Sequence, residues 1–318
     1  MRDYLYLCDI IKYMKFASLI DLFDKFKTEE DCREYLIQQR WNGKPVCPHC
    51  GYAEKAYRIE GGKRFKCGNN KCYKKYSVTV GTFFENSNID LRTWFAAMYL
   101  ITAHKKGISS AQLARDLNVH QKTAWFLLHR VRGMVANGAP GMLKEEVQID
   151  ETFVGGKDKN RHTSKKKGYQ DDKGMVFGAI ETETGKVKTK VLPDTTGKSL
   201  QGAVKQFVHE GSIMVSDDHR GYSSLSNNYA HVIIKHSAGE YVNGAFTTNG
   251  IENFWSLFKR GIIGIYHQVS NDHLQAYADE FAYRYNTRKL NDQERLTSVL
   301  THTQGRLKYK DLTKKKEA

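Results

Sequence analysis

Two pairs of cysteines constrain the folding of this chain more than any other feature of its sequence. Two residues separate Cys47 from Cys50, four separate Cys67 from Cys72, and 16 residues lie between the pairs. Each short turn can aim two thiolates at one ion, and the intervening segment suffices for a hairpin that completes a tetrahedral site. Four thiolates with no open position favour structural zinc. The sequence therefore predicts a zinc ribbon over residues 41–80 whose folding depends on the metal.

The spacing leaves two alternatives open. One is that the four cysteines are ordinary buried residues, and the other is that His49, inside the first pair, competes as a ligand. Cys8 and Cys32 stand alone in helical patterns, where a cysteine is most simply a small core residue.

The chain is strongly basic, with 50 Lys and Arg against 35 Asp and Glu and a net charge of +15. This excess suits a polyanionic partner better than a small neutral substrate. Nine basic and two acidic residues fall between Lys44 and Lys75, and basic residues also gather at 157–173 and after Gly305. Basic and aromatic side chains interleave on the ribbon, which predicts phosphate contact, a solvated surface being the alternative. The ribbon residues expected to contact DNA are Lys63, Arg64 and Lys66.

The first 40 residues are predicted to form an N-terminal helical segment. Residues 17–40 carry apolar side chains at helical spacing, and Thr28 is an N-cap residue, so two short helices are expected there. The chain has no run of about 18 apolar residues and no secretory cleavage site. We therefore expect a soluble, cytoplasmic protein without a membrane partner.

Residues 88–138 are strongly helical and predict a helix-turn-helix DNA-binding domain. Ser109 or Ser110 caps its first helix, and the chain turns at Asn118 before the second helix begins. Polar side chains open the second helix, where a recognition helix reads bases. These side chains are Gln121, Lys122 and Thr123. A three-helix packing unit without DNA contact is the alternative.

Short apolar runs replace the helical pattern over residues 145–290. They predict strand, strand, strand, helix, strand, helix and strand, followed by two helices, which is an α/β pattern. Residues 291–318 are expected to be a basic tail, and its part from Gly305, with six basic and two acidic residues, is expected to be frayed. The chain is thus expected to be a multidomain α/β protein.

Acidic residues occupy three notable positions in this α/β region. Period-two alternation places Asp150 on the strand face opposite its apolar neighbours. A second apolar strand ends in Asp217 and Asp218, and the pattern does not choose between them. Glu252 shares a helix face with Lys259, away from an apolar stripe. Acids from two strands and a helix suit two divalent cations about 4 Å apart, although solvated surface acids are the alternative.

Longer motifs connect these features along the chain. In order they are CPHCG, SVTVGTFFENS, ISSAQLARDLNVHQKTAW, IDETFVGGK, SDDHRGY, TNGIENFWSLFKRGIIGIYHQVS and DEFAYRYNTR. Together they resemble the zinc-ribbon transposases of bacterial insertion sequences, the ISXO-like group that is numbered fifteen-ninety-five among insertion-sequence families. The likeness extends from about Leu19 to Arg288.

The resemblance implies a ribonuclease-H-like catalytic domain with a triad at Asp150, Asp217 and Glu252, which would bind Mg²⁺ or Mn²⁺. Asp217 is favoured over Asp218 because the family's acid lies five residues before a tyrosine, here Tyr222.

The same resemblance implies DNA contacts beside the triad. Lys259 matches a lysine that often accompanies the triad and contacts DNA phosphate, and Arg260 follows it. The chain departs from the family at Thr248, where relatives often carry His, and at Ser216, where they often carry Thr. We expect the change at Thr248 to affect the handling of DNA ends rather than metal binding.

These features predict a DDE transposase that binds double-stranded DNA at the inverted repeats of its element. It would use two metal ions to cleave strands and transfer them to target DNA. Synapsis of two ends implies a homo-oligomer on DNA, associated with the nucleoid in a bacterial cytoplasm. One alternative is a non-catalytic DNA-binding regulator or domesticated relic, and another is a ribonuclease-H-like nuclease or resolvase.

Overall fold

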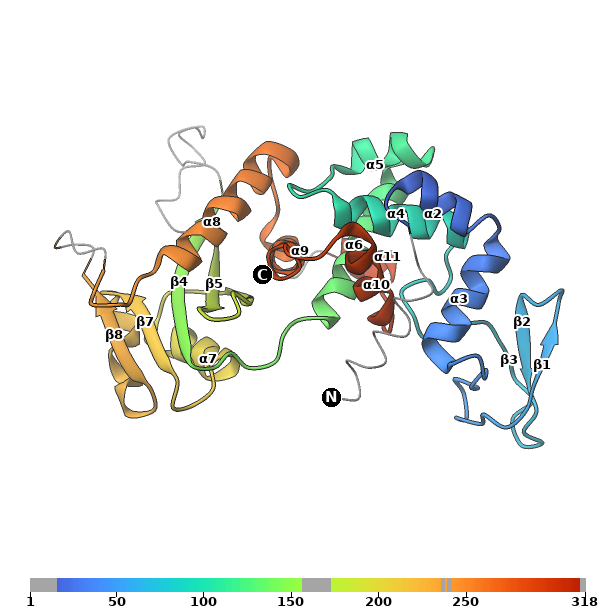
Figure 1. Cartoon of the computed structure of the whole chain (residues 1–318), viewed down its shortest axis with the longest axis horizontal. Helices are drawn as coiled ribbons and strands as arrows, with labels where there is room; N and C mark the ends of the chain where they lie inside the picture. The colour runs from blue at the N-terminus through green and yellow to red at the C-terminus, as the bar shows by residue number, and fades with distance from the viewer. Residues whose placement is uncertain (1–15, 156–172, 236–237, 239–241, 315–318) are drawn as a thin grey trace. The chain divides into compact units, whose positions relative to one another are not determined.

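The computed structural model describes residues 16–155, 173–235, 238 and 242–314, which form two compact units (Figure 1). One unit comprises Met1–Gly138 together with Leu290–Ala318, and the other comprises Ala139–Lys289. Cys8 and most of the basic segment 157–173 lie outside the described residues. None of the described helices combines the length and apolar composition that crossing a bilayer requires.

The first unit begins with two capped helices and a small sheet. Ser18 and Thr28 form capping boxes at the starts of α2 (Leu19–Lys25) and α3 (Glu29–Trp41), as the sequence predicted for Thr28. The sheet has the order β1-β2-β3 and is antiparallel throughout. Its strands are β1 (Ala56–Ile59), β2 (Arg64–Cys67) and β3 (Lys75–Tyr76).

Three helices follow the small sheet: α4 (Leu91–Ala103), α5 (Ser110–Leu117) and α6 (Gln121–Asn137). Ser109 caps α5 because its side chain accepts a hydrogen bond from the backbone N–H of Gln112. Asn118 ends α5 in the left-handed conformation, with φ of 51°, which turns the chain into α6. The helices expected between residues 91 and 135 are therefore present.

The residues after Leu290 add two helices to the first unit. Helix α10 (Asp292–Thr301) starts at a capping box on Asn291 and packs against α3, α4 and α6. It buries Leu296, Val299 and Leu300, whose helical spacing places them on one face. A short helix, α11 (Tyr309–Thr313), follows. Within the described residues, which end at Lys314, the expected basic tail thus contains two helices.

The second unit is built on a five-stranded sheet with the order β6-β5-β4-β7-β8. β4, β5 and β6 are antiparallel neighbours, whereas β7 runs parallel to β4 and β8 runs parallel to β7. The strands are β4 (Glu146–Val154), β5 (Gly174–Glu181), β6 (Val187–Leu192), β7 (Ile213–Asp217) and β8 (Ala230–Ile234). The predicted order of strands is present.

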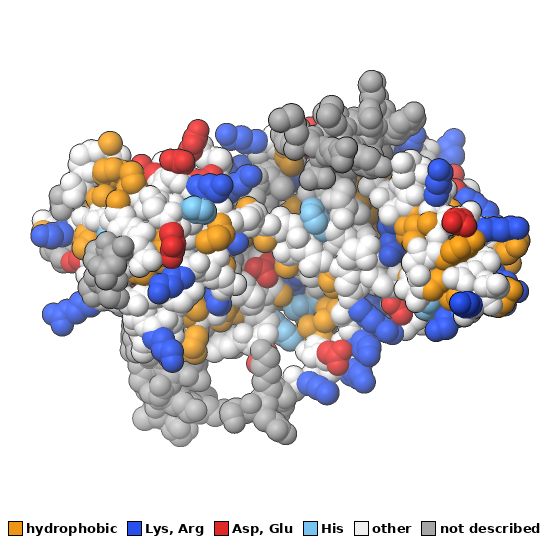
Figure 2. All heavy atoms as spheres, turned by 90° about the horizontal axis from the view of Figure 1, so that it is seen from below, with side chains coloured by type: hydrophobic (Ala, Val, Ile, Leu, Met, Phe, Trp, Pro, Cys, Tyr) orange, Lys and Arg blue, Asp and Glu red, His pale blue; other side chains and the backbone are white. Residues whose placement is uncertain are grey.

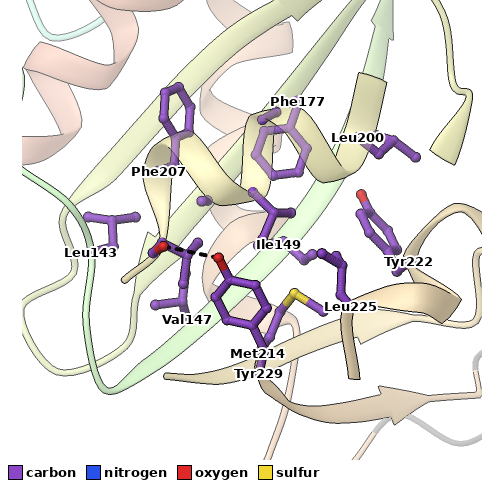
Figure 3. Packing of buried hydrophobic residues seen from close by; sticks show 14 of the residues in the cluster. Leu143, Val147, Ile149, Phe177, Leu200, Phe207, Met214, Tyr222, Leu225 and Tyr229 are labelled. Carbon is purple, nitrogen blue, oxygen red and sulfur yellow. Dashed lines mark hydrogen bonds between the residues drawn. The ribbon is translucent and has the colours of Figure 1, made fainter. Parts of the chain in front are cut away.

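Helices cover both faces of this sheet, so each face has its own apolar core. On one face, α7 (Gly197–Phe207) and the 3-10 helix η3 (Arg220–Asn227) pack over Val147, Ile149 and Phe177 (Figure 3). On the other, α8 (Asn249–Gly261) and α9 (Asn271–Asn286) pack over β5 and β6. A π-helix, η5 (Ile262–Tyr266), links α8 to the loop before α9.

Side-chain amides attach α9 to the edge strand β6. Asn286 accepts a hydrogen bond from the N–H of Val187 at 2.7 Å and donates one to its carbonyl at 2.9 Å. Gln275 likewise accepts from the N–H of Val191 at 2.7 Å and donates to the carbonyl of Thr189 at 3.1 Å. These contacts fix α9 along the length of β6.

Asp279 makes this attachment sensitive to pH. Its carboxylate accepts a hydrogen bond from Gln275 at 2.8 Å, and burial raises its pKa from 3.8 to about 6. The folded state thus binds the proton more tightly than the unfolded state, so stability is lost as pH rises from about 4 through about 6. We expect Asp279→Asn to stabilise the protein at pH 8 by at most about 3 kcal/mol. Urea unfolding at pH 8 and pH 4 measures the gain, and an equal gain at both values would contradict this origin.

Candidate active site and cysteine cluster

The four predicted zinc ligands converge in the first unit. The Sγ atoms of Cys47 and Cys72 lie 3.9 Å apart, and those of Cys50 and Cys67 lie 3.6 Å apart. All four sulfurs fall within 4.8 Å of one another, and His49 does not belong to this group. Four zinc–sulfur bonds of about 2.3 Å in tetrahedral geometry separate sulfurs by about 3.8 Å. The cluster therefore fits zinc in both donor chemistry and size.

The ribbon around this cluster has a very small apolar core. Phe65 stacks on Tyr76 with ring centres 5.5 Å apart, and the ring of Trp41 meets both edge-on. Phe65 and Cys67 of β2 are buried, whereas the alternating residues Arg64 and Lys66 are exposed. The expected DNA contacts Lys63, Arg64 and Lys66 are exposed, and basic side chains surround the ribbon at the right of Figure 2.

The polar side chains expected to read bases lie at the start of α6. Gln121 and Lys122 are exposed and Thr123 is half-buried. His120 precedes the helix, and its Nδ1 accepts a hydrogen bond from the backbone N–H of Lys122 at 3.2 Å. The Nζ atom of Lys122 lies 4.6 Å from the ring centre of Tyr309.

In the second unit, strand register brings two of the three predicted acids to one level. Gln148 of β4 pairs with Val215 of the parallel strand β7, so Asp150 and Asp217 lie two residues further along adjacent strands. Asp217 is the last residue of β7 and accepts a hydrogen bond from the N–H of His219 at 3.2 Å. Asp218 follows the strand and is exposed. This placement favours Asp217 as the partner of Asp150.

The electrostatic environment of Asp150 disfavours its charged form. Burial raises the pKa of Asp150 to about 7, and the neighbouring charges of Glu151 and Asp217 add to that rise. Neighbouring carboxylates that are partly shielded from water repel one another, and a bound cation would relieve that repulsion. Oxygen-only donors of this kind suit Mg²⁺ or Mn²⁺.

Glu252 lies near this pair in the fold but outside a common cluster. It is exposed on α8, and its Oε1 accepts a hydrogen bond from the Thr248 hydroxyl at 2.7 Å. Among the described residues, the four cysteines are the only group of three or more His, Cys, Asp or Glu side chains placed to hold one metal ion, so the three acids do not form such a group. Lys259 and Arg260 are exposed further along α8. The predicted apolar stripe of this helix, Ile251, Phe254, Trp255 and Phe258, is buried.

Gln148 is a site residue that the sequence reasoning missed. Thr248 precedes α8 without a side-chain cap to the backbone, and the Oε1 of Gln148 instead accepts the N–H of Ile251 at 3.1 Å. A Cβ at position 250 would lie 2.7 Å from this oxygen, so Gly250 permits the close approach. Gln148 is 3% exposed and lies two residues before Asp150. It therefore ties the helix of Glu252 to the strand of Asp150.

Removing this contact tests whether it positions the acids. We expect Gln148→Met, which fills the same space without the acceptor, to raise the Mg²⁺ concentration required to half-saturate the acidic side chains about 10- to 100-fold, as measured by calorimetric titration. Thr182→Val is the control, because it removes a second hydrogen bond of Gln148, 3.2 Å long, together with the bond from Thr182 to Glu146, and leaves the Gln148 acceptor in place. A loss of thermal stability in Gln148→Met with an unchanged Mg²⁺ requirement would mean that the contact is only structural.

A second missed contact fixes the loop after Asp217 from the opposite face of the sheet. Tyr222 is fully buried, and its hydroxyl donates a hydrogen bond to Oε2 of Glu151 at 2.5 Å. The Nε2 atom of His219 lies 3.8 Å from Oε1 of the same carboxylate. Tyr222, whose spacing favoured Asp217 over Asp218 in the sequence, thus joins β4 to the segment after β7. The sequence carried one indication of this contact: residues alternate between the two faces of β4, so Glu151 had to lie on the face opposite Asp150.

Models of two known protein families match this chain. An ISXO2-like transposase domain matches residues 142–286, and a transposase zinc-ribbon domain matches residues 27–75. The matched regions contain the three acids and the four cysteines, respectively.

Two curated relatives also carry transposon descriptions. An "Uncharacterized protein in transposable element ISH50" from Halobacterium salinarum is 28% identical over 291 residues, covering 86% of this chain and 97% of the relative. An "Uncharacterized transposase-like protein" from Haemophilus influenzae is 29% identical over 109 residues, covering 34% of this chain and 87% of the relative.

Likeness to solved structures is weak. A chain in a simian T-cell lymphotropic virus intasome with a PP2A regulatory subunit is 16% identical with a TM-score of 0.27, and the match covers 58% of this chain and 64% of that one. A chain in a pre-cleavage Mos1 transpososome is 11% identical with a TM-score of 0.28, over 91% and 97% of the two chains. These scores are too low to carry an argument.

Proposed function

Because this chain belongs to the ISXO2-like family of zinc-ribbon insertion-sequence transposases, we propose that it cleaves and joins DNA strands at the ends of its own element. One observation carries the proposal: Asp150 and Asp217 lie at one level of adjacent strands, with Gln148 tying in the helix of Glu252. The strand order, three antiparallel strands followed by two parallel ones, supports a ribonuclease-H-like domain.

Asp150, Asp217 and Glu252 would hold the catalytic Mg²⁺ or Mn²⁺. Such ions, when bound, would supply Lewis acidity to an attacking hydroxyl and to the leaving oxygen of an in-line phosphoryl displacement. The protein's own groups supply orientation. Gln148 holds the start of α8 against β4, and the Glu151–Tyr222 hydrogen bond holds the segment after Asp217. Lys259 and Arg260, on the exposed side of α8, would neutralise phosphates of the bound strand.

DNA recognition would come from the first unit. The turn at Asn118 between α5 and α6, with exposed Gln121 and Lys122 opening α6, supports a helix-turn-helix. The exposed Lys63, Arg64 and Lys66 support phosphate contact by the ribbon. Handling two element ends together would require more than one copy of the chain.

The test is a cleavage and joining assay with the full chain. Its substrate is a linear duplex carrying the inverted repeats that flank the gene, incubated with target plasmid and Mg²⁺. We expect nicks at the element ends and joined products, none of which form in EDTA. Specific binding without any cleavage would instead support a DNA-binding regulator. Preference for branched junctions over linear ends would support a resolvase.

A further inference from the structure

The C-terminal segment Gly305–Lys314 lies against the first half of α6. The ring of Tyr309 meets the ring of Phe126 edge-on with centres 5.5 Å apart, and that of Trp125 at 6.3 Å. The Nζ atom of Lys122 lies over the same ring. Positions 122, 125 and 126 lie on one side of a helix, so Tyr309 packs beside the side chains that open α6.

Backbone contacts fix where this segment starts. Phe83 donates its N–H to the carbonyl of Thr303 at 3.0 Å, and Gly305 donates its own to the carbonyl of Gly81 at 3.1 Å. The side chain of Asn137, at the end of α6, donates to the carbonyl of Gln304 at 2.6 Å. Arg306 forms an ion pair with Glu85 at 3.4 Å. The segment is therefore attached to both ends of α6.

The outward side of the segment is basic. Leu307, Tyr309 and Leu312 are half-buried, whereas the side chains between them are exposed. The exposed charged residues of the segment are Arg306, Lys308, Lys310, Asp311 and Lys314. Four of these five are cations, and they lie on the segment that packs beside Lys122.

A segment that contacts the proposed recognition helix could either compete with DNA or help to bind it, and the sign of its charge distinguishes these two roles. A segment that competes with DNA would present acidic side chains to the basic helix, because these would replace the phosphates. This segment instead adds cations next to Lys122, which raises the attraction for a phosphate backbone. The positive charge therefore favours a segment that helps to bind DNA over one that blocks the helix.

We propose that the C-terminal segment and the start of α6 form one duplex-binding surface, in which Lys308 and Lys310 contact phosphates. Tyr309 holds the segment in place by packing on Phe126 and Trp125. The proposal rests on the DNA-binding function proposed above and extends it to residues outside the helix-turn-helix.

Removing the two lysines in the full chain tests the surface directly. Binding is measured by fluorescence anisotropy with a short labelled duplex of random sequence, across a range of NaCl concentrations. Each lost phosphate contact lowers the slope of log affinity against log salt by about 0.9, so Lys308→Ala with Lys310→Ala should lower it by about 2. Lys25→Ala with Lys27→Ala is the control, since it removes the same charge from exposed positions at α2.

A second pair of variants tests the role of Tyr309. Tyr309→Ala removes the ring and should weaken binding by roughly tenfold or more at moderate salt, while Tyr309→Phe keeps the ring and should bind like the wild type. An unchanged salt slope in the lysine variant, or tighter binding in either the lysine or the Ala variant, overturns the proposal while the wider DNA-binding function stands. Absence of salt-dependent binding by the wild-type chain overturns both.

Discussion

Replacing Asp150 with Asn is expected to lower strand cleavage and joining by roughly three orders of magnitude or more, with the fold and DNA affinity retained. The amide keeps the shape of the side chain but loses the negative charge that would bind a divalent cation. Asp150 is half-buried beside other acids, and Asn replaces it without repulsion, so the variant should fold at least as well. Rates are measured under single-turnover conditions with saturating DNA and a range of Mg²⁺ concentrations.

Asp218→Asn provides the matched control for that experiment. Asp218 is adjacent to Asp217 in the sequence but lies beyond the end of β7 and is exposed. Its replacement should leave the cleavage rate within a few-fold of the wild type. If the Asp150→Asn enzyme still joins ends to target DNA, the catalytic assignment fails. If Asp218→Asn loses as much activity as Asp217→Asn, the choice between these two acids is wrong.

Removal of zinc is expected to unfold the ribbon while leaving the second unit folded. The ribbon packs little beyond Trp41, Phe65 and Tyr76, and its strands contain between two and four residues. Structural zinc contributes on the order of 10 kcal/mol to the folding of such small modules. Amide hydrogen exchange with and without a strong chelator measures the effect. Protection should disappear across β1–β3 and persist in β4 and β5.

Cysteine variants separate zinc binding from packing. Cys67→Ser should lower bound zinc well below one equivalent and abolish protection in the ribbon. Cys32→Ala is the control, because this cysteine is fully buried in α3 and burial raises its pKa to about 12, so it stays a thiol. The control should retain its zinc. Ribbon protection that survives both chelation and Cys67→Ser would refute a metal-dependent fold.

Local sequence patterns predicted the features that depend on neighbouring residues. The N-cap at Thr28, the turn at Asn118 and the buried stripe of α8 all follow from side chains a few positions apart. The cysteine spacing predicted a cluster for the same reason, since each pair forms its own turn.

Contacts between distant residues were beyond such patterns. The hydrogen bond from Ile251 to Gln148 spans 103 positions, and a glutamine in a strand gives no indication of which helix it will cap. The hydrogen bonds by which the chain after α10 returns to Gly81 and Phe83 are equally non-local. That Asp150 and Asp217 lie at the same level of adjacent strands was implied by the family resemblance alone, because no local sequence pattern encodes the register of parallel strands.

The attachment of α9 to β6 bears on how copies of this protein can meet. An edge strand with unpaired backbone groups is a template for another strand, and that risk grows where several copies gather on DNA. Gln275 and Asn286 occupy backbone groups of Val187, Thr189 and Val191 that a foreign strand would need. The edge of the sheet at β6 therefore cannot pair with a strand of another copy. Contacts between copies in the proposed complex with two DNA ends must use other surfaces.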